Sequence, residues 1–150
     1  MSKRKNCDLI AVGDLIAVAS PPGLLFGRLA NFINGELVGK VSNVPWSVIF
    51  PEIDNLPRHP SQLYEAFLEG IVLFIILNKF INKKNYKIGH CSILFLIFYG
   101  TFRIFAELFR EPDIQIGYIF NFLSMGSLLS IVMILSGIII FFIKKDENRL

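Results

Sequence analysis

Polar side chains that can bind anions or move protons lie inside apolar runs at three places in this 150-residue sequence. In the run YGTFRIFAELFR, Tyr99, Arg103, Glu107 and Arg110 fall at i, i+4, i+8 and i+11, which is one face of a helix. An ionised side chain at the centre of a bilayer costs at least about 2.5 to 3.5 kcal/mol on insertion scales. Such residues therefore line a pathway or cavity, or pair with one another. Two interpretations stay open for Arg103 and Glu107: an ion pair that only holds two helices together, and the lining of a functional cavity. Arg110 lies close enough to the membrane boundary for its side chain to reach the interface.

The segment GRLANFINGELVG holds a second polar cluster. Arg28 and Asn31 stand at i, i+3, and Asn34, Glu36 and Gly39 follow as the predicted helix ends. Glycines allow backbone to come close to a ligand, and arginine binds two phosphate oxygens at once through its planar fork of donors. The pattern indicates a phosphate site, with a reentrant turn whose polar groups are internally satisfied as the alternative.

A third cluster, RHPSQLYEAFLEG, opens another apolar run. Ser61 is a candidate helix cap, and Gln62, Glu65 and Glu69 then share one helical face just inside the outer boundary. His59 has the ordinary pKa range of a general base, about 6.5. Its place in a loop beside Pro60 favours a solvated histidine instead.

The elements that position these clusters are membrane helices. Hydrophobic residues make up 53% of the chain, which has 15 Phe and a mean hydropathy of +0.57. Three runs, 63–80, 88–109 and 116–143, are long enough to cross a bilayer. A fourth, 9–33, is interrupted by Asp14, by Ser20-Pro21-Pro22-Gly23 and by Arg28, which predicts a short entry segment followed by a half-buried helix. We therefore expect an all-α, polytopic membrane helical bundle of about four spanning helices, with residues 1–150 as a single membrane unit.

Basic residues in the short connections predict the orientation, because Lys and Arg are retained on the cytoplasmic side. They form clusters at the N-terminus, between the second and third runs and at the C-terminus: Lys3 to Lys5, Lys79 to Lys87, and Lys144 to Arg149. Both termini are then cytoplasmic, and the connections 40–62 and 110–115 face outward with most of the polar side chains. The net charge of +3 is spread over these clusters and does not indicate nucleic-acid binding.

Other classes of site find little support in the sequence. It has no P-loop, GxSxG, HExxH or CxxC pattern, so no metal and no cofactor are expected. Cys7 and Cys91 are too far apart for a metal-binding pair and are read as free thiols. A cleaved signal peptide is disfavoured, since Asp8 and Asp14 interrupt the first apolar stretch.

These motifs together resemble the prolipoprotein diacylglyceryl transferase family. The segments GRLANFINGELVG, HPSQLYEAFLEG and YGTFRIFAELFREPD occur in the family's order and spacing, and the resemblance runs from Asp8 to Lys145. The family moves a diacylglyceryl group from phosphatidylglycerol to the lipobox cysteine of a prolipoprotein, the first step of bacterial lipoprotein maturation. The resemblance implies an enzyme in the bacterial inner membrane, with its site toward the outer leaflet.

The resemblance also implies roles for individual residues and partners. The implied catalytic residues are Arg28, Tyr99, Arg103 and Glu107, and the implied phosphatidylglycerol-binding residues are Arg28, Asn31, Glu36, Gly39, Glu65 and Arg103. Within that set the arginines would bind the headgroup, Asn31 and Tyr99 would orient it, and Glu36 and Glu107 would hold the arginines. The expected partners are phosphatidylglycerol, a prolipoprotein lipobox peptide, membrane lipids and a separate N-terminal fragment, with no nucleic acid.

Two departures from the family pattern affect these expectations. Ala30 stands where the family usually has glycine. Family members are also longer, and the chain corresponds to their C-terminal half, without the N-terminal spans and a His-Gly-Gly segment whose histidine is the family's base or orienting residue. His59 occupies a different position. We therefore expect transferase activity only together with an upstream portion.

Two other functions stay open on the sequence alone. A non-catalytic membrane remnant or interaction protein from a split or truncated gene would keep the polar clusters as packing. A small transporter or channel subunit would explain intramembrane charge but not its concentration toward one leaflet.

Overall fold

The computed structural model describes residues 9–111, 118–119 and 123–147, and within these ranges the chain is mostly helical. The long helices are α1 (Leu9–Ile33), α4 (His90–Glu107) and α5 (Met125–Glu147). A further helical stretch consists of α2 (Ser61–Glu65), the π-helical segment η1 (Ala66–Val72) and α3 (Leu73–Ile81), which follow one another without a gap. Two short hairpins pair β1 (Val48–Ile49) with β2 (Pro57–Arg58), and β3 (Tyr118–Ile119) with β4 (Leu123–Ser124).

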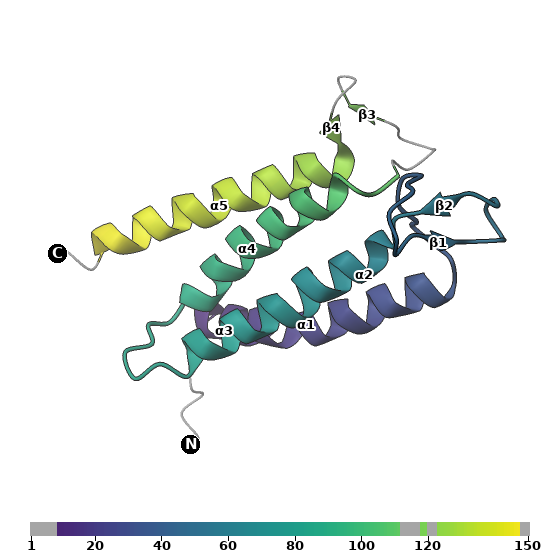
Figure 1. The fold of residues 1–150 in the computed structure, drawn as a ribbon. Coiled ribbons are helices and arrows are strands. Elements are labelled where there is room, and N and C mark those ends of the chain that lie inside the picture. The colour runs from purple at the N-terminus through teal and green to yellow at the C-terminus, as the bar shows by residue number, and fades with distance from the viewer. Residues whose placement is uncertain (1–8, 112–117, 120–122, 148–150) are drawn as a thin grey trace, which may run out of the picture.

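The helices lie side by side, and both hairpins lie at one end of the bundle, which we call the hairpin end (Figure 1). Helix α5 packs along α4, while α1 packs against α2, η1, α3 and α4. In the described part of the chain, α1, α4 and the segment Met125–Lys144 of α5 are long and apolar enough to cross a membrane. The expectation of a helical membrane protein is confirmed at this level.

Small residues bring the helices close together. A Cβ on Gly100 of α4 would lie 2.8 Å from the Ser130 carbonyl oxygen of α5, and one on Gly70 of η1 would lie 2.7 Å from the Leu25 Cβ of α1. Membrane helices associate through such close backbone contacts, because the hydrophobic effect does not drive apolar side chains together in lipid. Large apolar side chains such as Leu129 and Ile139 are accordingly exposed along α5.

The predicted break within residues 9–33 is wrong, because α1 is one continuous helix of 25 residues that contains Pro21 and Pro22. Each proline removes one backbone donor, and neighbouring polar groups can satisfy the acceptors that this leaves. The Ser20 hydroxyl donates to the Ile16 carbonyl at 2.6 Å in the turn before the prolines.

Asp14, the other feature that suggested a break, is buried at 1% exposure. Its carboxylate accepts hydrogen bonds from the Ser92 backbone N–H and hydroxyl, both at 2.7 Å, and from the Tyr86 hydroxyl and the Gly89 N–H. Asp14 therefore caps the first turn of α4 from a neighbouring helix, at the end of the bundle opposite the hairpins. Burial, together with the bond to Asp14, raises the pKa of Tyr86, which lies in the connection between α3 and α4.

The predicted span 116–143 begins later than expected. Helix α5 starts at Met125, and the chain before it forms the β3–β4 hairpin within the described residues. The Ser124 hydroxyl accepts from the Ser127 N–H at 3.1 Å, as a helix cap does. This cap fixes the start of the helix at a point that hydropathy alone does not mark.

Candidate active site

Three arginines and three glutamates meet between the helices toward the hairpin end, and we call them the arginine–glutamate cluster. Its members come from α1, α2, η1, α4 and the turn after α4: Arg28, Glu65, Glu69, Arg103, Glu107 and Arg110. Positive and negative members are equal in number, so the formal charges of the six side chains balance. Charges taken out of water are tolerated only when they are paired in this way.

Glu65 is the centre of the cluster. Its Oε2 lies 2.8 Å from the Arg28 Nε and 2.8 Å from the Arg103 Nη1, while its Oε1 lies 3.6 Å from the Arg110 Nη1. The side chain is only 1% exposed. One carboxylate therefore joins cationic groups from α1, α4 and the turn beyond α4.

The remaining acids complete the pairing of the same arginines. Glu69 Oε2 accepts from the Arg28 Nη2 at 3.2 Å, and Glu69 Oε1 lies 3.7 Å from the Arg103 Nη1. Glu107, one turn along α4, lies 3.3 Å from the Arg103 Nη2. Arg103 thus contacts all three acids of the cluster.

The π-helical segment aims these acids inward. Gln62, Glu65 and Glu69 are each 1% exposed or less, which confirms the predicted common face. Single π-helical turns inside α-helices are frequent at functional sites, because the extra residue redirects side chains. Glu69 is absent from the predicted site set, although its spacing of four residues from Glu65 is a signal that could have found it.

Several buried polar atoms in the cluster and in the adjacent Gln62 lack a hydrogen bond to any described residue. They are Gln62 Oε1, Glu65 Oε1, Glu69 Oε1, Arg103 Nη1 and Glu107 Oε2. Buried polar atoms in proteins are almost always hydrogen-bonded, so five in one place are unusual for a purely structural ion network. The four atoms that belong to the cluster lie within ion-pair distance of other cluster members but are not aligned for hydrogen bonds. The arrangement is suited to exchanging partners with a polar ligand.

Arg110 differs from its expected placement. It is 6% exposed and turns toward Glu65, so it does not reach for the interface as predicted. Helix α4 ends at Glu107, and the following turn directs Arg110 back into the bundle.

Glu107 also contacts the start of α5. A Cβ on Gly126 would lie 3.0 Å from the Glu107 Oε2, so the absence of a side chain there leaves room for the carboxylate. The first turn of a helix carries unpaired N–H groups and a partial positive charge, which favour a nearby carboxylate.

Gly39 lies among backbone groups. Its N–H donates to the His59 carbonyl at 3.1 Å, and its own carbonyl accepts from the Arg58 Nη1 at 3.0 Å. An added Cβ would lie 2.3 Å from the His59 oxygen and 2.8 Å from the Phe109 oxygen. The predicted close approach of backbone is therefore to two other chain segments.

Asn31, Glu36 and Tyr99 stand outside the cluster. The exposed Glu36 side chain forms no ion pair with any described residue, and it is the Glu36 carbonyl that accepts from the Gln62 Nε2, at 2.6 Å. The Asn31 carbonyl accepts from the Glu36 N–H at 2.8 Å. The half-buried Tyr99 ring stacks on Phe95 with centroids 5.4 Å apart. The expected support of an arginine by Glu36 is thus not seen within the described residues.

Next to the cluster lies an aromatic nest formed by Trp46, His59, Tyr64 and Phe109. The Tyr64 hydroxyl accepts from the Trp46 Nε1 at 2.7 Å and lies 3.0 Å from the His59 Nδ1. His59 packs edge-on against Tyr64 and Phe109, at 5.9 and 5.2 Å between ring centroids. His59 is half-buried and bonded, which differs from the solvated loop histidine that the sequence favoured.

The Ser61 hydroxyl does not cap α2. It donates to the Leu37 carbonyl at 3.1 Å, and Pro60 occupies the cap position. Together with the Gln62–Glu36 bond, this contact attaches the start of α2 to the chain that follows α1. The cap signal in the sequence identified a hydrogen-bonding serine but not its partner.

Arg58 organises the outer connection between α1 and α2. Its Nη2 donates to the Asp54 Oδ2 at 2.6 Å, and its Nη1 lies 3.3 Å from the Glu111 Oε2. The bond from Arg58, followed by the Leu56 N–H, holds the pKa of Asp54 below its ordinary value of 3.8. Sequence reasoning noted these residues only as loop polarity.

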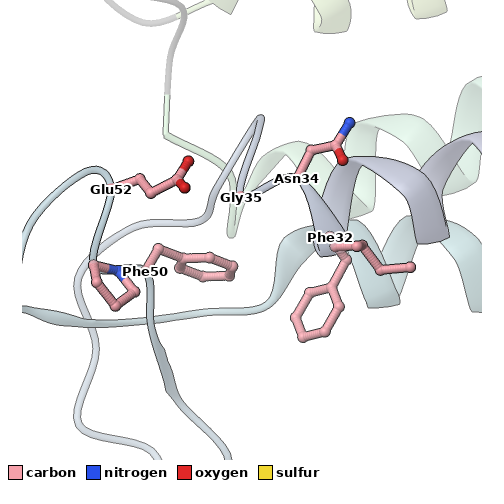
Figure 2. A pocket seen from close by; sticks show the side chains of 7 residues that line it. Phe32, Asn34, Gly35, Phe50 and Glu52 are labelled. Atoms are coloured by element: carbon pink, nitrogen blue, oxygen red, sulfur yellow. The ribbon is translucent and has the colours of Figure 1, made fainter.

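A small groove lies at the hairpin end between the end of α1 and the turn after β1. It has a volume of about 160 Å³, with the rings of Phe32 and Phe50 on one side and the polar ends of Asn34 and Glu52 on the other (Figure 2). The two rings meet edge to face at 5.9 Å between centroids. The groove is separate from the cluster, none of whose six members lines it.

Comparison with known proteins decides the family. The family model described as prolipoprotein diacylglyceryl transferase matches residues 1–143. The chain belongs to this family. The resemblance on which the sequence reading rested is therefore confirmed.

Curated members of the prolipoprotein diacylglyceryl transferase family share about half of their residues with this chain across the match. Proteins named phosphatidylglycerol–prolipoprotein diacylglyceryl transferase include one from Rickettsia bellii (strain OSU 85-389), 54% identical over 149 residues, which are 98% of this chain and 56% of the relative. One from Rhodospirillum rubrum is 51% identical over 151 residues, covering 99% and 55%. One from Pseudoalteromonas translucida is 55% identical over 130 residues, covering 87% and 48%. The chain spans about half the length of the relatives it matches.

Proposed function

We propose that this chain is the phosphatidylglycerol-binding part of a prolipoprotein diacylglyceryl transferase, and that the arginine–glutamate cluster binds the lipid headgroup. The observation that supports this most is the set of buried, unaligned polar atoms around Arg103 and Glu65. A phosphate that enters the cluster can accept hydrogen bonds from guanidinium N–H groups that are not fully hydrogen-bonded to the carboxylates.

Arg28 and Arg103 are the proposed phosphate ligands. Arg28 engages Glu65 and Glu69 through its Nε and Nη2, and its Nη1 donates no hydrogen bond to a described residue. Guanidinium groups bind phosphate oxygens in pairs and remain charged in an apolar setting. Glu65, Glu69 and Glu107 keep the arginines in place before the lipid arrives.

Neighbouring residues have proposed supporting roles. Asn31 and Tyr99 orient the headgroup by hydrogen bonds, and Gly39 holds the segment after α1 against the turn after α4. For Glu36 the carbonyl bond to Gln62 suggests a role in anchoring α2, which replaces the expected contact with an arginine.

The proposed reaction is substitution at carbon. The lipobox cysteine sulfur forms a bond to the C3 carbon of the diacylglyceryl group, the bond from that carbon to the phosphate oxygen breaks, and glycerol-1-phosphate leaves. The thiol proton leaves the sulfur as the bond forms, and the released glycerol-1-phosphate takes up a proton in its place, so that atoms and charge balance. Arginines fixed in a water-poor site stabilise the charge that develops on the leaving phosphate, because electrostatic interactions are stronger there than in water. No cofactor takes part.

The proposed setting is the bacterial inner membrane, with four spanning helices and both termini cytoplasmic. The stretch Ser61–Ile81 is the fourth span, since a helix of this length is about 30 Å long at 1.5 Å per residue. The basic connection between α3 and α4, with Lys83, Lys84 and Lys87, lies at the end opposite the hairpins, which supports an orientation with the arginine–glutamate cluster toward the outer leaflet. Residues 1–150 form one membrane unit in this arrangement, and a prolipoprotein lipobox peptide is the acceptor.

A transfer assay tests this function. The chain is reconstituted together with the portion of a matched relative that the match leaves uncovered, and transfer of a fluorescent diacylglyceryl group from phosphatidylglycerol to a lipobox peptide is measured. Arg103→Ala is expected to abolish transfer while the protein stays in the membrane. Lys84→Ala, which removes an exposed cation at the opposite end, is the matched control and is expected to retain transfer. Unchanged transfer by Arg103→Ala would refute the role of the cluster, and no transfer by any combination would favour a non-catalytic interaction protein.

A further inference from the structure

His59 has a fixed position beside the arginine–glutamate cluster. Its N–H donates to the Lys40 carbonyl at 3.0 Å, and its carbonyl accepts from the Gly39 N–H at 3.1 Å and the Ser61 N–H at 2.8 Å. The backbone on both sides of the ring is therefore held by the segment after α1 and by the start of α2. A loop histidine free to reorient would not have these bonds.

The ring is linked to the cluster through the residues on which it packs. Its packing partners, Tyr64 and Phe109, immediately precede two cluster members, Glu65 and Arg110. Tyr64 is nearer than Glu65 to the start of α2, and Phe109 follows the end of α4, so the nest lies on the hairpin side of the cluster.

The hydrogen bonds of the nest favour one arrangement of protons on the imidazole. The indole N–H of Trp46 can only donate, so the Tyr64 oxygen is its acceptor at 2.7 Å. The only acceptor that the described residues offer to the Tyr64 proton is the His59 Nδ1, at 3.0 Å. With Nδ1 as that acceptor, the ring carries its proton on Nε2.

The charged groups around the nest already have partners. Arg58 binds Asp54 and Glu111, Arg110 lies against Glu65, and Lys40 donates to the Leu108 carbonyl at 2.9 Å. Nε2 makes no hydrogen bond with a described residue, and the ring is half-buried rather than sealed. In the tautomer that accepts from Tyr64, His59 therefore presents an Nε2–H donor beside the phosphate-binding arginines.

We infer that His59 is a specificity-determining residue that donates its Nε2–H to a hydroxyl oxygen of the headgroup glycerol of phosphatidylglycerol. This inference rests on the proposed function, in which the arginines bind the phosphate of the same lipid. The glycerol is the part of the headgroup beyond the phosphate, and the nest lies on that side of the cluster. Trp46 and Tyr64 act as positioning residues, because they select the tautomer that donates.

The same geometry assigns His59 no role as the base for the acceptor thiol. A base at Nε2 would need its proton on Nδ1, which would leave the Tyr64 hydroxyl proton without an acceptor among the described residues. A role as hydrogen-bond donor and a role as base can be told apart by substituting the histidine with glutamine. A glutamine amide N–H can stand in for the Nε2–H donor, but it cannot accept a thiol proton.

The experiment measures lipid affinity by the emission of Trp46, the one tryptophan of the chain. Short-chain phosphatidylglycerol and phosphatidic acid are titrated into the full chain in detergent, with phosphatidylcholine of the same chain length as the background control. His59→Phe is expected to lower the affinity for phosphatidylglycerol about five- to tenfold, as the loss of one hydrogen bond predicts. It is expected to leave the affinity for phosphatidic acid, which has no headgroup glycerol, within about twofold. His59→Gln is expected to restore most of the loss.

An equal loss for both lipids, no loss in His59→Phe, or no rescue by glutamine would overturn the inference. Nitrogen NMR of the histidine ring gives a second test that needs no lipid, and a protonated Nδ1 in the neutral ring would overturn it as well. If the parent chain does not bind phosphatidylglycerol at all, the proposed function fails and the ligand assigned to His59 fails with it. If the parent chain binds phosphatidylglycerol but the His59 variants do not show the expected affinities, the His59 inference alone is refuted.

Discussion

At the scale of single residues, Glu65 is the residue on which the arginine–glutamate cluster depends most. Its carboxylate is almost fully buried and contacts Arg28, Arg103 and Arg110, so its charge offsets cationic groups that have little access to water. Removing one partner from a buried ion network leaves the others uncompensated, which costs more than the pair contributes on balance.

We therefore expect Glu65→Gln to destabilise the protein by about 3 to 5 kcal/mol, the cost of an uncompensated buried charge. The measurement is the unfolding midpoint of the purified chain in detergent. Glu36→Gln is the matched control, since the Glu36 side chain is exposed and forms no ion pair with the described residues, and it is expected to stay within about 0.5 kcal/mol. Equal effects of the two variants would contradict the central place of Glu65.

Gly39 supports a second prediction at this scale. Gly39→Ala puts a Cβ within 2.8 Å of two backbone oxygens that cannot move independently of their segments, so we expect a loss of at least about 2 kcal/mol. Gly23→Ala is the control, because no atom lies within 4 Å of its Cβ position and alanine favours the helix by about 1 kcal/mol. Thermal unfolding of the two variants should shift in opposite directions, and a neutral Gly39→Ala would refute the tight contact.

Residue periodicity predicted part of the site and missed the rest for physical reasons. The faces that carry Arg103 with Glu107, and Glu65 with its neighbours, follow from the helical repeat alone. The partners across helices do not, because they depend on how α1, α2 and α4 pack. The family resemblance assigned Glu36 to an arginine, but α1 ends at Ile33, and the positive φ angle of Gly35 (68°) turns the chain before that side chain.

At the scale of elements, the connection between α1 and α2 holds the hairpin end together. Arg58 joins β2, the turn at Asp54, the Gly39 carbonyl and Glu111 beyond α4. No residue periodicity marks this connection, since its contacts join residues far apart in the chain. The continuous α1 was missed for a related reason, because the partners that bind the Asp14 carboxylate, Tyr86, Gly89 and Ser92, are far from it in the chain.

The Asp54–Arg58 pair gives this connection a predictable pH dependence. The pKa of Asp54 is lower in the folded state than its ordinary 3.8, so its stabilising effect is complete above that value and is lost as the pH falls through the folded pKa. Trp46 emission, followed from neutral pH downward, is expected to stay constant until below about pH 4 and then to change as the connection loosens. Asp54→Asn should remove that acidic transition, and an unchanged transition in this variant would contradict the assignment.

At the scale of the whole molecule, the polar chemistry gathers at one end of the helices. Both hairpins lie at that end (Figure 1). The cluster includes Glu65 at the end of α2 and Arg110 just beyond α4, whereas Asp14 caps the start of α4 at the opposite end. Hydropathy and charge distribution predicted this overall plan, because both act through composition and not through detailed packing. Hydropathy and charge did not predict where α5 starts, because the hydrogen bond from the Ser127 N–H to the Ser124 hydroxyl determines that position.

The proposed orientation can be checked by thiol labelling. In a background with Cys7→Ser and Cys91→Ala, we expect a membrane-impermeant reagent added outside to modify Asn43→Cys and to leave Asn85→Cys unmodified until the membrane is opened. Both positions are exposed in the described structure, so access from solvent is equal and only the side of the membrane differs. The reverse pattern would place the arginine–glutamate cluster in the inner leaflet.

The most direct test of the central claim is equilibrium binding of phosphatidylglycerol and phosphatidylcholine to the chain, measured by native mass spectrometry for the parent and for Arg103→Ala. If the cluster binds the anionic headgroup, the parent prefers phosphatidylglycerol by about tenfold or more, and Arg103→Ala loses that preference. Equal affinity of the parent for the two lipids, or a preference that survives in Arg103→Ala, would contradict the claim.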